Sequence, residues 1–292
     1  MTDVELVYDS KSTLGEGPMW SVKEQALYWV DIPNKSFHRY DPSSGAHEQY
    51  DVGQMIGTVV LRKSGGFVLA LHEGLYFWDK TNGLQQIASP EPDKPDNRFN
   101  DGAVDRQGRF WAGTMGMNSP EPTGALYRLD TDHSLHKMET GIKTSNGIGW
   151  SPDNKIMYYC DTGPRTIWQY DFDVATGAIE NRRPFTIVPE VEGEGAPDGL
   201  TVDSEGFIWS ARWGGWKICR YDPAGKIERE IKVPAARVTS VVFGGPNLDE
   251  LYITCARIGF DEAELERTQP HAGSIFRAYP GVKGLPEPEY GG

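Results

Sequence analysis

The stretch WSPDNKIMYYCD, which begins at Trp150, carries the pattern that decides the fold: a turn rich in Pro, Asp and Asn, followed by an aromatic strand. Turn residues bounding short aromatic runs are typical of β-strands. The same pattern recurs at intervals of about 41 to 52 residues, as WSVKEQALYWVD from Trp20, LRKSGGFVLAL from Leu61, VDRQGRFWAGT from Val104, VDSEGFIWSAR from Val202 and FGGPNLDELYITCAR from Phe243. Repeats of this length indicate a propeller or a solenoid.

A second aromatic strand follows each copy and ends in a turn: FHRYDPSSG, LYFWDKTNG, ALYRLDTD, IWQYDFDVATG, ICRYDPAG and SIFRAYPG. Apolar and polar residues alternate in these phrases, as they do in half-buried strands. The units together predict an all-β, six-bladed β-propeller with four antiparallel strands per blade. A parallel solenoid is the alternative, but a propeller closes its ring and removes exposed sheet edges. The tail LPEPEYGG is too short for another blade, so we expect the segment near Val4–Tyr8 to complete the last one, within a single domain spanning residues 1–292.

The composition limits the classes of partner. The chain has 292 residues, of which 38% are hydrophobic and 24% charged, with a formal net charge of -13. Such an acidic surface repels phosphate backbones and anionic lipid heads, so neither nucleic acid nor a membrane is expected as a partner. The three cysteines lie far apart, which predicts neither a disulfide framework nor a thiolate zinc site. Since the N-terminus lacks a signal sequence and no long apolar run occurs, we expect a cytoplasmic protein.

Equivalent positions of the repeats meet around the axis of a propeller, because the first strand of each blade lines the channel. The residues four positions before each copy are Glu16, Gly57, Asn100, Asn146, Asp198 and Thr239. Asn-Gly and Asp-Gly are common turn dipeptides, but Glu is a poor turn residue, and a longer carboxylate that reaches a centre explains it better. The nearby glycines weaken a strand, a cost that we attribute to close approach to a ligand. Carboxylates and amides without imidazole or thiolate favour Ca²⁺, Mg²⁺ or Mn²⁺.

These phrases resemble the senescence-marker-protein, gluconolactonase and luciferin-regenerating-enzyme family. The likeness runs from Leu14 to Arg257 through LGEGPMW, RFNDGAVDRQGRFWAGTM, SNGIGWSPDNKIMYYCDT and PDGLTVDSEGFIWSARWGG. The resemblance implies a six-bladed propeller with one axial divalent cation that is held by Glu16, Asn146 and Asp198. It also implies sugar contacts from Arg98 and Asn100, and the hydrolysis of aldonolactones. Some members carry an acidic substrate contact after the GTM motif, where a simple count in this chain reaches Asn118, so the sugar preference stays open.

The resulting hypothesis is metal-dependent hydrolysis of a sugar lactone, such as gluconolactone or a pentonolactone, to the aldonic acid. The cation polarises the carbonyl, and Asp198 accepts the proton of the attacking water; Asp101 is the second candidate base and a candidate substrate contact. Ca²⁺ is the first choice of ion, with Zn²⁺, Mg²⁺, Mn²⁺ and Fe²⁺ open. The alternatives are a non-catalytic, calcium-binding regulatory propeller and a promiscuous metal-dependent esterase or organophosphate hydrolase. The family resemblance implies a monomer.

Overall fold

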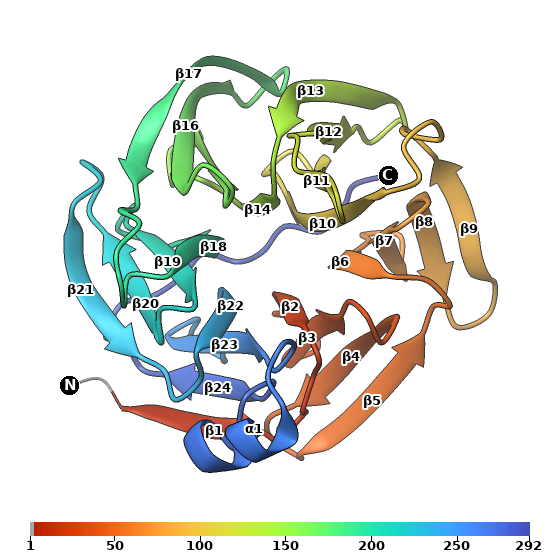
Figure 1. The fold of residues 1–292 in the computed structure, drawn as a ribbon. Coiled ribbons are helices and arrows are strands. Elements are labelled where there is room, and N and C mark those ends of the chain that lie inside the picture. Colours follow the sequence, from red (N-terminus) through yellow and green to blue (C-terminus); the bar gives the residue numbers. More distant parts are fainter. Residues whose placement is uncertain (1–2) are drawn as a thin grey trace.

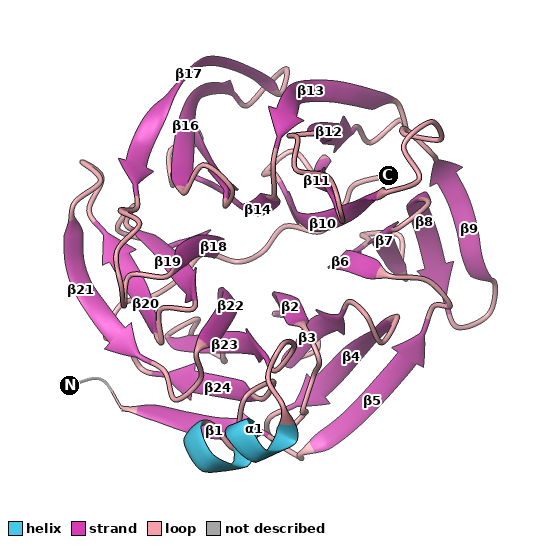
Figure 2. Ribbon diagram, viewed as in Figure 1, coloured by secondary structure: helices cyan, strands magenta, loops and turns pink. Residues whose placement is uncertain are grey.

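The computed structural model describes residues 3–292. Its sheets are arranged around a common axis like the blades of a propeller (Figure 1). Strands dominate the secondary structure (Figure 2), and within the described range the only helix is α1 (Glu262–Thr268). Asp261 caps this helix by accepting a hydrogen bond from the Glu264 N–H. No helix in residues 3–292 is long and apolar enough to cross a membrane.

Four of the sheets each consist of four consecutive antiparallel strands. They are β2 (Gly15–Ser21), β3 (Ala26–Asp31), β4 (Ser36–Asp41) and β5 (Ala46–Asp51); β6 (Ile56–Leu61), β7 (Phe67–Leu71), β8 (Gly74–Asp79) and β9 (Gly83–Ala88); β10 (Asn97–Val104), β11 (Phe110–Gly116), β12 (Gly124–Leu129) and β13 (Leu135–Ile142); and β14 (Ser145–Trp150), β15 (Ile156–Asp161), β16 (Thr166–Asp173) and β17 (Ala178–Ile187). The two aromatic phrases of each repeat form the second and third strands, as the sequence predicts.

A further sheet of eight strands comprises two groups of four. The groups are β18 (Ala196–Val202), β19 (Ile208–Trp213), β20 (Lys217–Tyr221) and β21 (Ile227–Lys232), and then β22 (Arg237–Gly244), β23 (Glu250–Ala256), β24 (Ile275–Ala278) and β1 (Val4–Tyr8). A single residue pair, Trp213 with Arg237, joins the two groups. Strand β1 runs antiparallel to β24, with Val4 opposite Ala278. The expectation that the N-terminal segment completes the last group is therefore confirmed.

The first strands of the groups lie nearest the axis (Figure 1). Each of these inner strands contacts the next around a closed ring, in the order β2, β6, β10, β14, β18 and β22 and back to β2. Glycine permits this close approach: a Cβ on Gly147 would lie 2.3 Å from the Leu200 nitrogen, and one on Gly199 would lie 2.4 Å from the Ser240 Cβ. The glycines beside Asn146 and Asp198 are thus required by the packing of neighbouring strands. Close approach to a ligand is therefore not needed to explain these glycines, and it stays a prediction.

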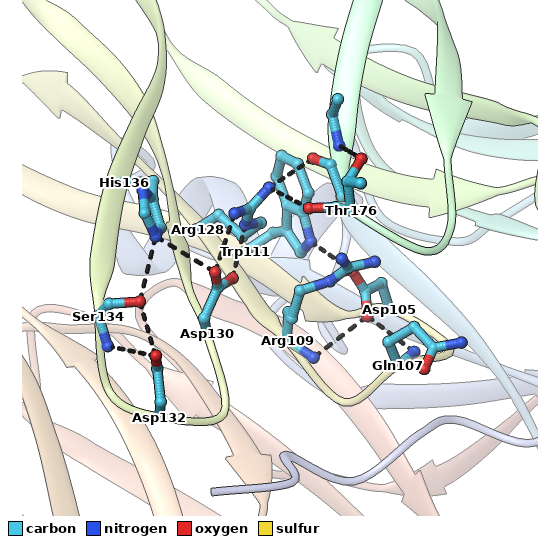
Figure 3. A network of polar contacts seen from close by, with 12 residues as sticks. Asp105, Gln107, Arg109, Trp111, Arg128, Asp130, Asp132, Ser134, His136 and Thr176 are labelled. Carbon is cyan, nitrogen blue, oxygen red and sulfur yellow. Dashed lines mark hydrogen bonds and ion pairs between the residues drawn. The ribbon is translucent and has the colours of Figure 1, made fainter.

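The Asp of the repeated turn has a structural role. Asp105 accepts hydrogen bonds from Trp111 Nε1 at 3.0 Å and from Arg109 Nε at 2.6 Å (Figure 3). Asp203, its equivalent after β18, accepts from Trp209 Nε1 at 2.9 Å. Both carboxylates also accept backbone N–H groups of their own turns. The phrases VDRQGRFW and VDSEGFIW therefore encode a turn that is tied to a buried tryptophan.

The C-terminal segment crosses the axis at one end of the channel (Figure 1, violet trace). Its Gly284 N–H donates to the Leu248 carbonyl at 2.7 Å, and farther along the Tyr290 N–H donates to the Leu61 carbonyl at 2.8 Å. Tyr290 is fully buried, and its hydroxyl donates to the Asp130 carbonyl. We call residues 281–292 the tail. The tail covers a cavity of the channel, which Leu285, Glu287 and Pro288 line together with the inner strands.

Candidate metal centre

The six positions that the sequence register selects coincide with irregularities in the inner strands. In every inner strand the pairing register shifts at this point. Asn100 lies between the paired residues Phe99 and Asp101, and Glu16 is the last paired residue before the shift in β2. The residues inside the other shifts are Gly57, Asn146 with Gly147, Asp198 with Gly199, and Thr239. A bulge breaks the alternation of a strand and re-aims a side chain, so these positions can present polar groups at one depth of the ring.

Two carboxylates, Glu16 and Asp198, are buried at this depth with few partners. Their exposed fractions are 5% and 3%. Glu16 Oε2 accepts a hydrogen bond from the Gly17 N–H at 3.2 Å. Asp198 Oδ1 is buried and has no hydrogen-bond partner among the described residues. A buried carboxylate oxygen without a partner is costly and is a natural ligand for a cation.

Burial and mutual repulsion change the pKa of both groups. Burial, followed by the charge of Asp101, raises the pKa of Glu16 to about 8, and the Arg98 guanidinium partly offsets the increase. Burial raises the pKa of Asp198 well above its ordinary value, and the charges of Glu16 and Asp101 add to the effect. Burial also raises the pKa of Asp101 to about 6. Without a cation, Glu16 therefore retains a proton near neutral pH, whereas Asp101 is mostly ionised there.

Two amides and one arginine lie beside the carboxylates. Arg98 Nη1 donates to Asn100 Oδ1 at 2.6 Å, and Asn100 Nδ2 donates to Asn146 Oδ1 at 3.0 Å. Asn146 Nδ2 in turn donates to Thr162 Oγ1 at 2.7 Å. Arg98, Asn100 and Asn146 are all buried. Thr162 does not stand out in the sequence because it follows β15, a second strand, whereas the repeat register compares only first strands.

The donor set fits an oxygen-coordinated divalent cation. Glu16, Asn146 and Asp198 can offer carboxylate and amide oxygens, which Ca²⁺ and Mg²⁺ prefer. No group of three or more His, Cys, Asp and Glu side chains in residues 3–292 is arranged to hold a metal ion. Asp101 instead lines the cavity that the tail covers.

Asn118 is not part of this buried group. It lies in the loop that follows β11 and is exposed. In residues 3–292 its side chain forms no hydrogen bond; the carbonyl of the adjacent Ser119 accepts from Lys143 Nζ at 2.7 Å. Contact between Asn118 and a substrate stays a prediction.

Comparisons with known proteins agree over almost the whole chain. Residues 14–257 match the family described as SMP-30/Gluconolactonase/LRE-like region. The chain is 39% identical to regucalcin of Danio rerio, covering 99% of this chain and 98% of that protein. It is also 39% identical to pentonolactonase XacC of Haloferax volcanii, with 97% of each chain covered.

Solved structures with the same fold also match nearly the whole chain. A calcium-binding protein, regucalcin, from Agrobacterium tumefaciens superimposes with a TM-score of 0.93 at 29% identity, over 99% of this chain and 97% of that one. A luciferin-regenerating enzyme superimposes with a TM-score of 0.91 at 35% identity, with 100% of both chains covered.

Proposed function

Because the chain belongs to the SMP-30/gluconolactonase/LRE-like family, we propose that it hydrolyses a sugar lactone to the aldonic acid with the help of one divalent cation. The observation that carries this proposal is the pair of buried carboxylates, Glu16 and Asp198, whose negative charges repel each other. Asp198 also has one buried oxygen without a hydrogen-bond partner among the described residues. The similarity to a pentonolactonase supports the choice of substrate class.

The proposed architecture is a single domain of six blades. We count each group of four strands as one blade, with the eight-stranded sheet as two blades that share one residue pair. The cation then lies on the axis, held by Glu16, Asn146 and Asp198. Ca²⁺ is the first ion to test because all the donors are oxygens, followed by Mg²⁺, Mn²⁺, Zn²⁺ and Fe²⁺.

The residues around the cation divide the work of hydrolysis. A bound divalent cation supplies Lewis-acid polarisation of a carbonyl. Asp198 accepts the proton of the water that adds to the lactone carbonyl carbon. When the ring C–O bond breaks, this proton passes to the ring oxygen that leaves. Asp198 is preferred over Asp101 as the base because Asp101 lines the cavity on the side of the tail.

Arg98 and Asn100 are the proposed substrate contacts. Arg98 is 8% exposed and Asn100 is 5% exposed, and they lie in the same strand as Asp101. Burial lowers the pKa of Arg98 to about 10, so it stays charged at neutral pH. Its guanidinium can donate to ring hydroxyls or to the carboxylate of the product.

A calcium-binding regulatory protein without catalysis is the second candidate function. The similarity to regucalcins, one of them described as a calcium-binding protein, favours it. This function needs the same cation ligands but no proton acceptor and no substrate contacts.

Acid release from lactones separates the candidates. Metal-free protein is mixed with glucono-1,5-lactone and with a set of pentonolactones, with and without each divalent ion, and the spontaneous rate is subtracted. We expect a rate that a chelator abolishes and that one ion restores. Ca²⁺ binding without chelator-sensitive hydrolysis of any lactone supports the regulatory function instead. Chelator-sensitive cleavage of aryl esters or organophosphates alone moves the activity to another ester class.

A further inference from the structure

A chain of side-chain hydrogen bonds connects three neighbouring inner strands. From Arg98 it passes to Asn100 and then to Asn146. It continues from Asn146 Nδ2 to Thr162 Oγ1 at 2.7 Å, and Thr162 Oγ1 donates to the Pro197 carbonyl at 2.8 Å. We call this chain the relay. It ends one residue before Asp198.

The direction of the relay is fixed at both ends. A guanidinium can only donate hydrogen bonds, and a backbone carbonyl can only accept them. Arg98 therefore requires an oxygen from Asn100, and the Pro197 carbonyl requires the hydroxyl proton of Thr162. With its proton directed to Pro197, Thr162 Oγ1 must accept from Asn146, so the amide nitrogen of Asn146 faces Thr162. The amide oxygen of Asn146 then faces Asn100, and this assignment follows from donor chemistry alone.

We propose that Thr162 is a positioning residue for the cation site. Its hydroxyl holds the Asn146 amide so that Oδ1 is the atom available to the cation, and it anchors the carbonyl that precedes Asp198. The inference rests on the cation site of the proposed function and adds a residue to it. Groups that orient metal ligands commonly change metal affinity by about 10- to 100-fold when they are removed.

The hydroxyl can be separated from the structural role of Thr162. The backbone N–H of Thr162 donates to the Thr144 carbonyl, and its own carbonyl accepts from the Arg165 N–H. Any residue at this position can form these turn contacts. Since the side chain is only half-buried, valine, which has the same shape, fits there without the hydroxyl.

The test measures cation affinity in the absence of substrate. Chelator-stripped full-length protein is titrated with Ca²⁺ by calorimetry, as wild type, Thr162→Val and Thr162→Ser. We expect Thr162→Val to bind about tenfold more weakly and Thr162→Ser, which keeps the hydroxyl, to bind within about twofold of wild type. Thr201→Val is the matched control: Thr201 lies in the same strand as Asp198, and its hydroxyl forms no hydrogen bond within the described residues. This control is expected to bind like wild type.

Unchanged affinity in Thr162→Val overturns the inference, and so does a Thr162→Ser variant that binds as weakly as Thr162→Val. If Thr162→Val does not fold, Thr162→Ala provides the same loss of the hydroxyl in a smaller side chain. Wild-type protein that binds no divalent cation overturns the proposed function together with this inference. Wild-type protein that binds and hydrolyses, beside a Thr162→Val variant of equal affinity, overturns the role of Thr162 alone.

Discussion

The two halves of each inner strand differ in regularity and in chemistry. The first halves contain the register shifts and carry Glu16, Asn100, Asn146 and Asp198. The second halves pair regularly and line the cavity that the tail covers; their apolar residues, which also belong to buried hydrophobic clusters, include Val60, Val104, Trp150, Val202 and Val242. The comparison indicates that the two halves of an inner strand have different roles. Irregular backbone carries the buried polar groups, and regular backbone lines the cavity under the tail.

The largest expected effect on activity comes from a substitution in the first halves of the inner strands, which carry the buried polar groups. Asp198→Asn keeps one oxygen but removes the proton acceptor, so we expect kcat/KM for the preferred lactone to fall by about a thousandfold. Steady-state kinetics with the restoring ion measure this. Glu192→Gln, which removes an exposed charge in the loop before β18, is the control and should keep the wild-type rate. A loss below tenfold in Asp198→Asn means that another group takes the proton.

Changes in the tail, which covers the second halves of the inner strands, should affect stability instead of catalysis. Tyr290 is fully buried and joins the tail to β6 and to the turn after β12. Tyr290→Ala leaves a large cavity, and we expect it to lower the free energy of unfolding by about 3 kcal/mol. Tyr290→Phe, which loses only the hydrogen bond to the Asp130 carbonyl, should cost about 1 kcal/mol. Urea denaturation of the metal-free protein measures both.

The same Tyr290 variants test whether the two halves are independent. We expect the Ca²⁺ affinity of folded Tyr290→Phe to equal that of wild type. A tenfold weaker affinity contradicts the division between the two halves.

The pH dependence of stability reports on the polar half directly. Glu16 has a pKa near 8 in the folded metal-free protein but an ordinary value when unfolded. The contribution of Glu16 to the free energy of unfolding is therefore fully present below about pH 4.5 and is lost as the pH rises toward 8. Relative to Glu16→Gln, wild-type protein in chelator should lose about 3 to 4 kcal/mol of stability between pH 5 and pH 8. Parallel curves for the two proteins contradict a buried Glu16 carboxyl with a raised pKa.

The smallest expected effect concerns Asn118. Because its side chain is exposed and outside the buried group, Asn118→Glu should change KM for individual lactones only severalfold and leave Ca²⁺ affinity unchanged. A panel of hexono- and pentonolactones measures the preference. A change of cation affinity in this variant places the loop after β11 closer to the centre than we describe.

The sequence predicts the sheets and the position of the candidate site, since both repeat with the same period. Glu16, Asn100, Asn146 and Asp198 emerge from register alone because each occupies the same point of an inner strand. The bulges themselves are not predictable from this pattern, because Asn-Gly and Asp-Gly equally describe turns. Thr162 and the path of the tail depend on contacts between groups that are distant in sequence. Neither residue type nor spacing marks such contacts.

Titration of Ca²⁺ into chelator-stripped protein, followed by calorimetry for wild type and for Asp198→Ala, tests the axial cation site most directly. We predict one ion per chain in wild type and an affinity at least about a hundredfold weaker in the variant, with the fold of both checked by circular dichroism. Equal affinities in the two proteins, or a wild-type protein that binds no divalent ion, contradict a site built from Glu16, Asn146 and Asp198.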